Sequence, residues 1–260
     1  MVASLTDEER NRGLVTCSSG NHGIALAFSA NLFDQPPTKV FLPKNADPVK
    51  IDKIESYGAE AIIHGEHFLE TLDEALRYTE ETGATYVHSH GHPLVIAGQG
   101  TIGLEIIEDL PDGETILIPI GGGGLCSGIA TAVKAAAPQI RILGVEPTAA
   151  PGAYLSIRDG YCHEWIDIKN SVADGLLGTF TPLTYEISRS LLENIVLVEE
   201  TEIIEAMRFF QQEEQLMIEG SASVGLAAIL NNKVDVAGQK VVLILTGRNI
   251  NANTYNKLIN

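Results

Sequence analysis

The 260-residue chain has few cysteines, no long apolar run and few basic residues. Its three cysteines (Cys17, Cys126 and Cys162) are far apart and odd in number, which favours free thiols in a reducing cytoplasm over a disulfide framework. No apolar stretch approaches the length of a membrane span, and the acidic, polar amino terminus lacks the features of a secretory signal. We therefore expect a cytoplasmic protein without a membrane partner.

Acidic residues outnumber basic ones two to one. There are 34 Asp and Glu residues against 17 Lys and Arg, so the formal net charge is −17. This charge repels phosphate backbones and anionic lipids, which excludes nucleic acid and membrane surfaces as expected partners. The hydrophobic content of 45% is that of an ordinary globular protein, and the length suffices for one large domain or two modest ones.

Short β-rich runs alternate with amphipathic runs along almost the whole chain. Strands are predicted at residues 14–17, 39–42, 59–64, 115–120, 140–145, 195–198 and 241–246, and helices at 48–57, 68–82, 98–110, 125–136, 201–215 and 222–230. This rhythm predicts an α/β fold of parallel sheets covered by helices. The least regular stretch, residues 149–181, is expected to cover a surface or a cleft.

Three polar or glycine-rich clusters follow predicted strands, where ligands bind in such folds. They are Ser18-Ser19-Gly20-Asn21-His22-Gly23, Gly121-Gly122-Gly123-Gly124-Leu125 and Thr246-Gly247-Arg248-Asn249. Four consecutive glycines before a helix expose successive amides and predict a phosphate site, although they do not complete a dinucleotide fingerprint. Each cluster alone fits a plain turn. Three of them at strand ends favour a ligand site.

A fourth cluster supports a different interpretation. The run His88-Ser89-His90-Gly91-His92 has three imidazoles at alternate positions, which on a strand would share one face and could hold zinc. Gly91 and Pro93 argue against a regular strand there and favour a polar loop. A zinc hydrolase remains an alternative hypothesis at this point.

The order of four motifs resembles a known family. The SSGNHG run, Ala97-Gly98-Gln99-Gly100-Thr101, the glycine quartet and the terminal TGRN together are similar to the serine/threonine dehydratase and serine racemase family of pyridoxal-phosphate enzymes. The resemblance extends from about residue 5 to residue 251. It implies a two-domain parallel-sheet fold of the tryptophan synthase beta type (pyridoxal-phosphate fold type II). We expect a small domain at residues 13–92, a large domain at 1–12 and 93–260, and a cleft between them.

The resemblance also implies roles for individual residues. Asn21 would bond the ring hydroxyl of pyridoxal phosphate, Thr246 would face the pyridine nitrogen, and Glu219 would lie near the ring. The phosphate would be held by the amides of Gly121, Gly122, Gly123, Gly124 and Leu125. The substrate carboxylate would be held by Ser18, Ser19, Gly20, Asn21 and His22. Ser19 matches the serine that donates a proton to the opposite face in racemases of the family.

A neutral hydroxyl at Thr246 gives the pyridine nitrogen no counter-charge, which favours loss of a β-substituent over transamination. The resemblance therefore implies an ammonia-lyase (dehydratase) that converts L-threonine or L-serine into a 2-oxo acid and ammonium. Serine racemase-like activity is one alternative, and a non-catalytic relative that binds the cofactor or an amino acid is another. A homodimer is compatible with each of them.

Two features depart from the family. The Schiff-base lysine of relatives lies in a Ser-x-Lys-x-Arg-Gly-Ala motif upstream of SSGNHG, and none of the nine lysines here matches it. We expect an amino-terminally truncated and inactive form with an exposed sheet edge; the alternatives are a lysine-less relative and a site completed by a second chain. Racemase-like members also bind a divalent cation through a glutamate matched by Glu146 and a carboxylate six residues on, where this chain has Gly152. Asp174 is the alternative carboxylate, and we expect no well-formed metal site.

Overall fold

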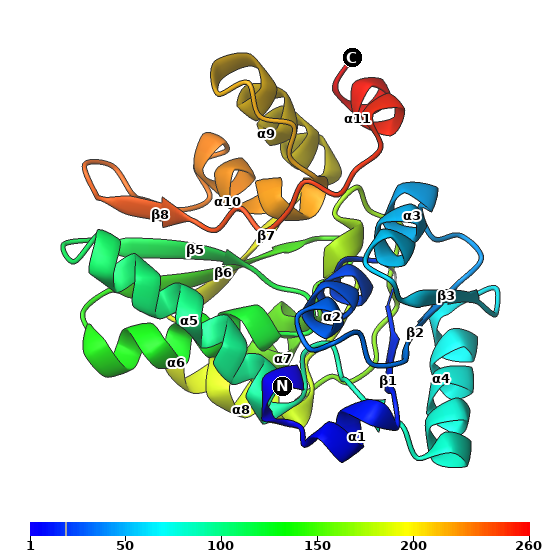
Figure 1. Cartoon of the computed structure of the whole chain (residues 1–260). Coiled ribbons are helices and arrows are strands. Elements are labelled where there is room, and N and C mark those ends of the chain that lie inside the picture. The colour runs from blue at the N-terminus through cyan, green and yellow to red at the C-terminus, as the bar shows by residue number, and fades with distance from the viewer. Residues whose placement is uncertain (19) are drawn as a thin grey trace. The chain divides into compact units, whose positions relative to one another are not determined.

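The computed structural model describes residues 1–18 and 20–260, which form two compact units, Met1–His92 and Pro93–Asn260 (Figure 1). Each unit contains a four-stranded sheet, and every pair of neighbouring strands is parallel. The predicted α/β class is therefore confirmed. Residues 1–12, which the sequence assigned to the larger domain, lie in the first unit, where the guanidinium of Arg10 stacks 5.1 Å from the ring centre of Phe33.

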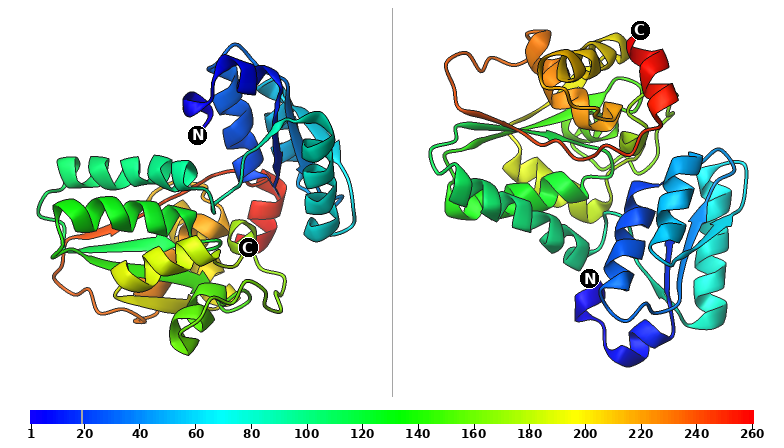
Figure 2. Two further views of the ribbon diagram at one scale, coloured as in Figure 1. Left: turned by 90° about the horizontal axis from the view of Figure 1, so that it is seen from below. Right: turned by 45° about the horizontal axis from the view of Figure 1, so that its top comes forward.

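The first sheet has the strand order β3-β2-β1-β4. Its elements are η1 (Val2–Ser4), α1 (Asp7–Asn11), β1 (Leu14–Cys17), α2 (Asn21–Asn31), β2 (Thr38–Leu42), α3 (Pro48–Ser56), β3 (Glu60–Ile63), α4 (Phe68–Thr82) and β4 (Thr85–Tyr86). Helices α2 and α3 cover one face of the sheet, with Ile24 and Ile54 packed on Val40, and α4 covers the other face, with Ala75 near Phe41 (Figure 2). SSGNHG thus lies where β1 ends and α2 begins.

The second sheet has the strand order β7-β6-β5-β8. Its elements are α5 (Pro93–Asp109), β5 (Thr115–Pro119), α6 (Gly124–Ala136), β6 (Arg141–Pro147), α7 (Gly152–Asp159), η2 (Asp174–Leu176), α8 (Pro182–Leu191), β7 (Asn194–Val198), α9 (Glu200–Glu213), α10 (Gly220–Leu230), β8 (Val241–Leu243) and α11 (Ala252–Ile259). Ile116 and Ile118 of β5 pack with α6 on one face, whereas Leu117 packs with α9 and α10 on the other. Burial on both faces explains why β5 is a continuous apolar run.

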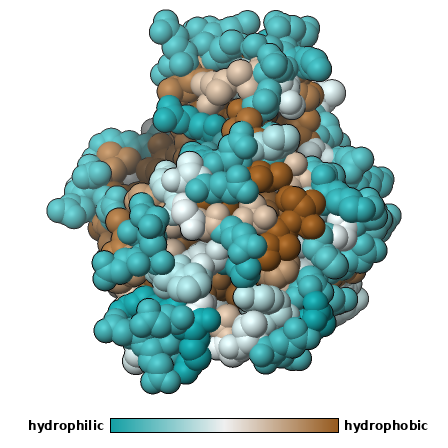
Figure 3. Space-filling model, turned by 45° about the vertical axis from the view of Figure 1, so that its right-hand side comes forward, coloured by the Kyte–Doolittle hydropathy of each residue, from teal (hydrophilic) through white to brown (hydrophobic). Residues whose placement is uncertain are grey.

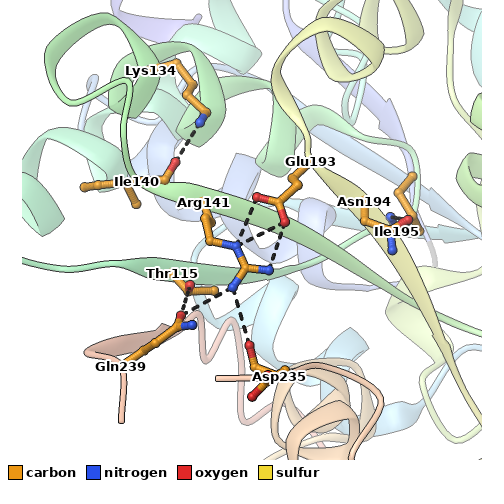
Figure 4. A network of polar contacts seen from close by, with 9 residues as sticks. All are labelled: Thr115, Lys134, Ile140, Arg141, Glu193, Asn194, Ile195, Asp235 and Gln239. Atoms are coloured by element: carbon orange, nitrogen blue, oxygen red, sulfur yellow. Dashed lines mark hydrogen bonds and ion pairs between the residues drawn. The ribbon is translucent and has the colours of Figure 1, made fainter. Parts of the chain in front are cut away.

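Arg141 links the amino-terminal ends of the strands of the second sheet through hydrogen bonds (Figure 4). Its guanidinium donates to both carboxylate oxygens of Glu193 at 3.1, 3.0 and 2.8 Å, and to the Asp235 carbonyl at 3.4 Å. Gln239 Oε1 accepts from Arg141 at 3.4 Å and from the Thr115 hydroxyl at 2.6 Å. The starts of β5, β6 and β7 are thereby joined to the segment before β8.

The predicted strands are confirmed in place, with small shifts at their ends. Helix α5 begins five residues earlier than predicted because Pro93 suits the first position of a helix. The stretch expected to be irregular contains α7, and the two-residue strand β4 was not predicted. The edges of the second sheet are β7 and β8; residues Val241–Leu243 of β8 are partly buried, and Leu245, which follows them, is 42% exposed.

The surface carries both polar and apolar residues; exposed large apolar side chains include Leu32, Leu104 and Trp165. On the face shown in Figure 3, hydrophilic residues predominate and hydrophobic ones gather in separate patches. All three cysteines are free thiols. Among the described residues, no helix is long and apolar enough to cross a membrane.

Helices α5 and α6 approach each other closely at glycines. A methyl group on Gly128 would overlap the carbonyl oxygen of Ile96 and would lie 2.7 Å from the amide nitrogen of Gly100.

We predict that Gly128→Ala lowers the free energy of unfolding by about 2 kcal/mol, because the packed helix would have to move. Gly98→Ala on α5 is the matched control, since nothing lies within 4 Å of its added methyl. It should stabilise by about 0.5–1 kcal/mol. Urea unfolding measures both, and equal effects would contradict the close approach.

Candidate functional site

The glycine quartet forms a turn at the carboxyl end of β5. The Ile120 amide still donates to the Val145 carbonyl at 2.9 Å, after which the chain leaves the sheet and enters α6 at Gly124. Gly123 is the N-cap residue with a φ of 86°, a left-handed conformation that favours glycine. The positive end of the α6 dipole therefore lies at this edge of the sheet.

The amides of this turn have no protein acceptor. Within residues 1–18 and 20–260, no acceptor lies in hydrogen-bonding geometry with the backbone amides of Gly121, Gly122, Gly123, Gly124 or Leu125. No side chain caps the helix. A row of donors at a helix start is the arrangement that binds phosphate in proteins. The turn thus fits an anion with several acceptor oxygens.

The turn is held in shape by the segment 173–184. A methyl on Gly121 would lie 3.0 Å from Leu176 Cα, and one on Gly123 would lie 2.5 Å from the Phe180 ring. The Thr184 hydroxyl donates to the Gly122 carbonyl at 3.0 Å. Two of the glycines are therefore required by close packing, and the backbone is fixed before any ligand binds.

Two further predicted residues lie in the same unit. Glu219 is 2% exposed and is the N-cap residue of α10, and its amide donates to the Gly247 carbonyl at 3.3 Å. A methyl on Gly247 would overlap Oε1 of Glu219 and lie 3.0 Å from its Cδ. The structure thereby brings Glu219 into contact with Gly247 of the TGRN motif. Thr246, which precedes Gly247, is exposed.

In the first unit, Ser18 organises the start of α2. Its Oγ accepts from the amides of Gly20 at 3.0 Å and Gly23 at 3.2 Å, and its side chain is buried. Ser18 thus satisfies two of the donors at the helix start by itself. Asn21 is the first residue of α2 and is partly buried. Ser19, the predicted proton donor, lies outside the described residues.

Lys50 is a buried lysine beside this turn. It lies on α3 and is 3% exposed. Its aliphatic carbons fill the space above Gly20, where a methyl would lie 3.0 Å from Lys50 Cγ and 3.1 Å from Lys50 Cβ. The sequence alone does not reveal this burial, because it depends on how α3 packs near the start of α2.

Imidazoles gather at the ends of β1 and β4. The Nε2–H group of His22 donates to the Val87 carbonyl at 3.0 Å. His88 Nδ1 accepts from the amides of His90 at 3.2 Å and Gly91 at 2.8 Å. The imidazole rings of His88 and His90 are packed edge to face, with their centroids 4.7 Å apart. Burial lowers the pKa of His22 and of His88, and burial together with the neighbouring imidazoles lowers the pKa of His90 to about 3.

The structure does not support the zinc hypothesis. His88 uses its Nδ1 atom for backbone amides, and His90 Nδ1 is 2.8 Å from the Ser89 hydroxyl. In the described part of the chain, no three His, Cys, Asp or Glu side chains are grouped so that they could hold a metal ion. Residues 88–92 therefore form a hydrogen-bonded loop, as the polar-loop interpretation predicted.

Glu146 lies within β6 and is fully buried. Its Oε1 accepts from the Ala153 amide at 2.9 Å and its Oε2 from the Tyr154 amide at 2.8 Å, both in the first turn of α7. Burial raises the pKa of this carboxyl to about 8, against the opposing effect of the two amides.

The chain is similar to known proteins over nearly its whole length. A family model described as "Pyridoxal-phosphate dependent enzyme" matches residues 1–247. The L-threonine ammonia-lyase of Thermotoga maritima is 42% identical over 260 residues, which are 100% of this chain and 64% of that protein. The catabolic L-threonine dehydratase of Escherichia coli K12 is 37% identical over 262 residues, covering 99% of this chain and 78% of that protein.

Solved structures agree with this result. Maize serine racemase has a TM-score of 0.93 and 34% identity, over 98% of this chain and 79% of that one. Threonine deaminase isoform 2 from Solanum lycopersicum has a TM-score of 0.92 and 31% identity, over 99% and 71%. The chain spans 64% of the length of the L-threonine ammonia-lyases of Thermotoga maritima and Geobacter sulfurreducens.

The histidine cluster predicts a pH dependence of stability. Because burial opposes the charged form of His90, unfolding takes up a proton below pH 6.5, and stability falls as the pH drops from 6.5 towards about 3. We expect the unaltered protein to lose about 2 kcal/mol more than His90→Asn between about pH 7 and about pH 5. Urea unfolding at the two pH values measures the difference. His64→Asn, at an exposed position of the same unit, is the control. Parallel losses in all three proteins would contradict the prediction.

Proposed function

Because the chain belongs to the family of pyridoxal-phosphate dependent enzymes, we propose that it carries the cofactor- and substrate-binding elements of a threonine/serine ammonia-lyase. The reaction removes the β-hydroxyl and the amino group of L-threonine or L-serine and yields a 2-oxo acid and ammonium. The observation that carries the proposal is the row of amides at residues 121–125, which fits the phosphate of the cofactor. The relatives named as L-threonine ammonia-lyases support the substrate class.

Each proposed role uses a feature of this chain. The amides of residues 121–125 and the α6 dipole would hold the phosphate, and the packing of Leu176 and Phe180 keeps them in place. Bound pyridoxal phosphate supplies an electron sink for negative charge at the amino acid's α-carbon. Asn21 would bond its ring hydroxyl, and Glu219 would lie beside the ring.

Thr246 would decide the type of reaction. A hydroxyl facing the pyridine nitrogen carries no charge, so it leaves that nitrogen without a counter-ion. Charge at the α-carbon is then less delocalised, and loss of the β-hydroxyl is favoured over transamination. The exposure of Thr246 leaves its hydroxyl accessible to a ligand.

The start of α2 would hold the substrate carboxylate. The Ser18 hydroxyl already engages the Gly20 and Gly23 amides, so its role in the proposal is to set the shape of the turn. His22 is anchored to Val87 and would fix the same turn from the other side. The carboxylate would be held by backbone amides of this turn, as the resemblance implies, and the proton-donor role of Ser19 stays a prediction.

Serine racemase activity is the second candidate. The similarity to maize serine racemase at a TM-score of 0.93 favours it, as does a serine at position 19. Measuring D-serine formed from L-serine separates it from the ammonia-lyase, because elimination gives a 2-oxo acid and ammonium with no D-serine.

Cofactor binding and turnover test the proposal. We expect the protein to bind pyridoxal phosphate, with inorganic phosphate as a competitor. Because none of its nine lysines matches the Schiff-base lysine of the family, we expect it to release no ammonium from L-threonine or L-serine. Gly123→Ala should weaken cofactor binding by about tenfold or more, because an alanine is strained at φ 86° and meets the Phe180 ring at 2.5 Å. Gly160→Ala is the control, since it has a φ of 78° with nothing within 4 Å. It should leave the affinity unchanged.

The outcomes separate the hypotheses. Ammonium release together with a borohydride-stable cofactor label on one of the nine lysines would show an active ammonia-lyase and would contradict the expected inactivity. Cofactor binding without a label and without ammonium is the expected result, and it agrees equally with the non-catalytic alternative. Failure to bind pyridoxal phosphate, or equal affinity in Gly123→Ala and the unaltered protein, contradicts the proposed phosphate site.

A homodimer is also proposed, together with a cytoplasmic location. An apolar groove of about 340 Å³ lies between α5, α6 and α8, beside Leu104 at 57% exposure. Exposed apolar surface of this kind favours contact between proteins. We expect Leu104→Glu to convert a dimer into a monomer in light scattering, whereas Leu32→Glu, at 64% exposure in the first unit, should not. A monomeric unaltered protein would contradict the prediction.

A further inference from the structure

Glu146 is a buried ionisable side chain that the proposed reaction does not use. It is 0% exposed, and both of its carboxyl oxygens accept backbone hydrogen bonds from the first turn of α7. Each oxygen has one amide partner, at 2.9 Å from Ala153 and 2.8 Å from Tyr154. The start of α7 thus supplies two donors and the positive end of a helix dipole to one buried carboxyl group.

Position 152, where relatives carry the second metal-binding carboxylate, has little room for a side chain. Position 152 is a glycine, and a methyl there would lie 2.9 Å from Thr179 Cγ2 and 3.4 Å from Thr179 Cα. A longer acidic side chain would need Thr179 to move. Across residues 1–18 and 20–260, no three His, Cys, Asp or Glu side chains are grouped so that they could hold a metal ion, and neither Glu146 nor Asp174 belongs to such a group. The donor set therefore does not fit a divalent cation.

We propose that the amino terminus of α7 takes the place of a divalent cation as the partner of Glu146, so that the protein keeps its structure and stability without Mg²⁺ or Ca²⁺. The two directed N–H groups and the partial positive charge of the helix end oppose the effect of burial on this carboxyl group. This inference rests on the contacts of Glu146 alone and holds whether or not the proposed reaction is correct.

The same contacts explain what Glu146 contributes to the fold. By anchoring α7 to β6, it fixes Gly152 against Thr179. Thr179 stands between Leu176 and Phe180, the two residues that pack on the glycine turn. Glu146 is therefore a positioning residue: it holds α7, which packs on Thr179, and the neighbours of Thr179 pack on the glycine turn at residues 121–124.

Thermal unfolding with and without cations tests the proposal. The protein, treated with a chelator, is melted with the chelator and again with millimolar MgCl₂ or CaCl₂, and binding of each salt is measured by calorimetry. We expect the midpoint to change by less than about 1 °C. Glu146→Gln should lower the midpoint by about 5 °C to the same extent with and without cation, since one amide of α7 would then face an NH₂ group. Glu164→Gln, at an exposed position of the same unit, should leave it unchanged.

The results decide as follows. A midpoint rise above about 3 °C with either cation that disappears in Glu146→Gln would overturn the proposal. A rise that persists in Glu146→Gln assigns a stabilising cation to another place on this acidic protein and contradicts the claim that its stability is independent of Mg²⁺ and Ca²⁺. If Glu146→Gln does not fold, the unaltered protein decides: saturable binding of one cation with such a rise contradicts the proposal, and its lack supports it.

Discussion

The parallel pairing of β5 with both of its neighbours is the constraint on which the second unit depends. Because β6 and β8 both run in the direction of β5, the three strands end at one edge of the sheet. The glycine turn and the TGRN motif must therefore meet there, although more than a hundred residues separate them in the sequence. The opposite edge carries the Arg141 network, which holds the strands in register without taking part in the site.

Close approach of backbones is the second recurring feature. At Gly128, helix α5 packs directly against α6. Segment 173–184 packs in the same way on Gly121 and Gly123, and the aliphatic part of Lys50 packs on Gly20. In each case a single methyl group would fill the space that another segment occupies. The glycines thus do more than permit turns: they set the distances at which helices and loops meet around the strand ends.

Much of this arrangement could be predicted from the sequence. Strands such as Leu14–Cys17 and Thr115–Pro119 are buried on both faces, so they read as unbroken apolar runs, and α4 has a clear amphipathic pattern. The strand and helix predictions succeeded because the information is local. The glycine quartet was predicted to be a phosphate site from its place between a strand and a helix, and that role stays a prediction.

The parts that escaped prediction depend on distant contacts. Helix α7 follows prolines and glycines and begins where a residue of the preceding strand, Glu146, provides its cap. Lys50 is buried only because α3 packs on α2, which no pattern in α3 itself reveals. The role of Ser18 as an internal acceptor likewise requires the folded turn, since an isolated serine is equally compatible with a contact to a ligand.

The Arg141 network also has a consequence for how the chain reaches this fold. Thr115 and Gln239, which share it, are 124 residues apart, and β8 joins the sheet directly after Gln239. During synthesis the first unit has all its strands once residue 92 has emerged, whereas the centre of the second sheet lacks a neighbour until β8 appears. Non-local pairings of this kind form slowly. The unit that carries SSGNHG should thus be folded on the ribosome while β5, which is buried along its whole length in the finished fold, still has an open side and needs protection from aggregation.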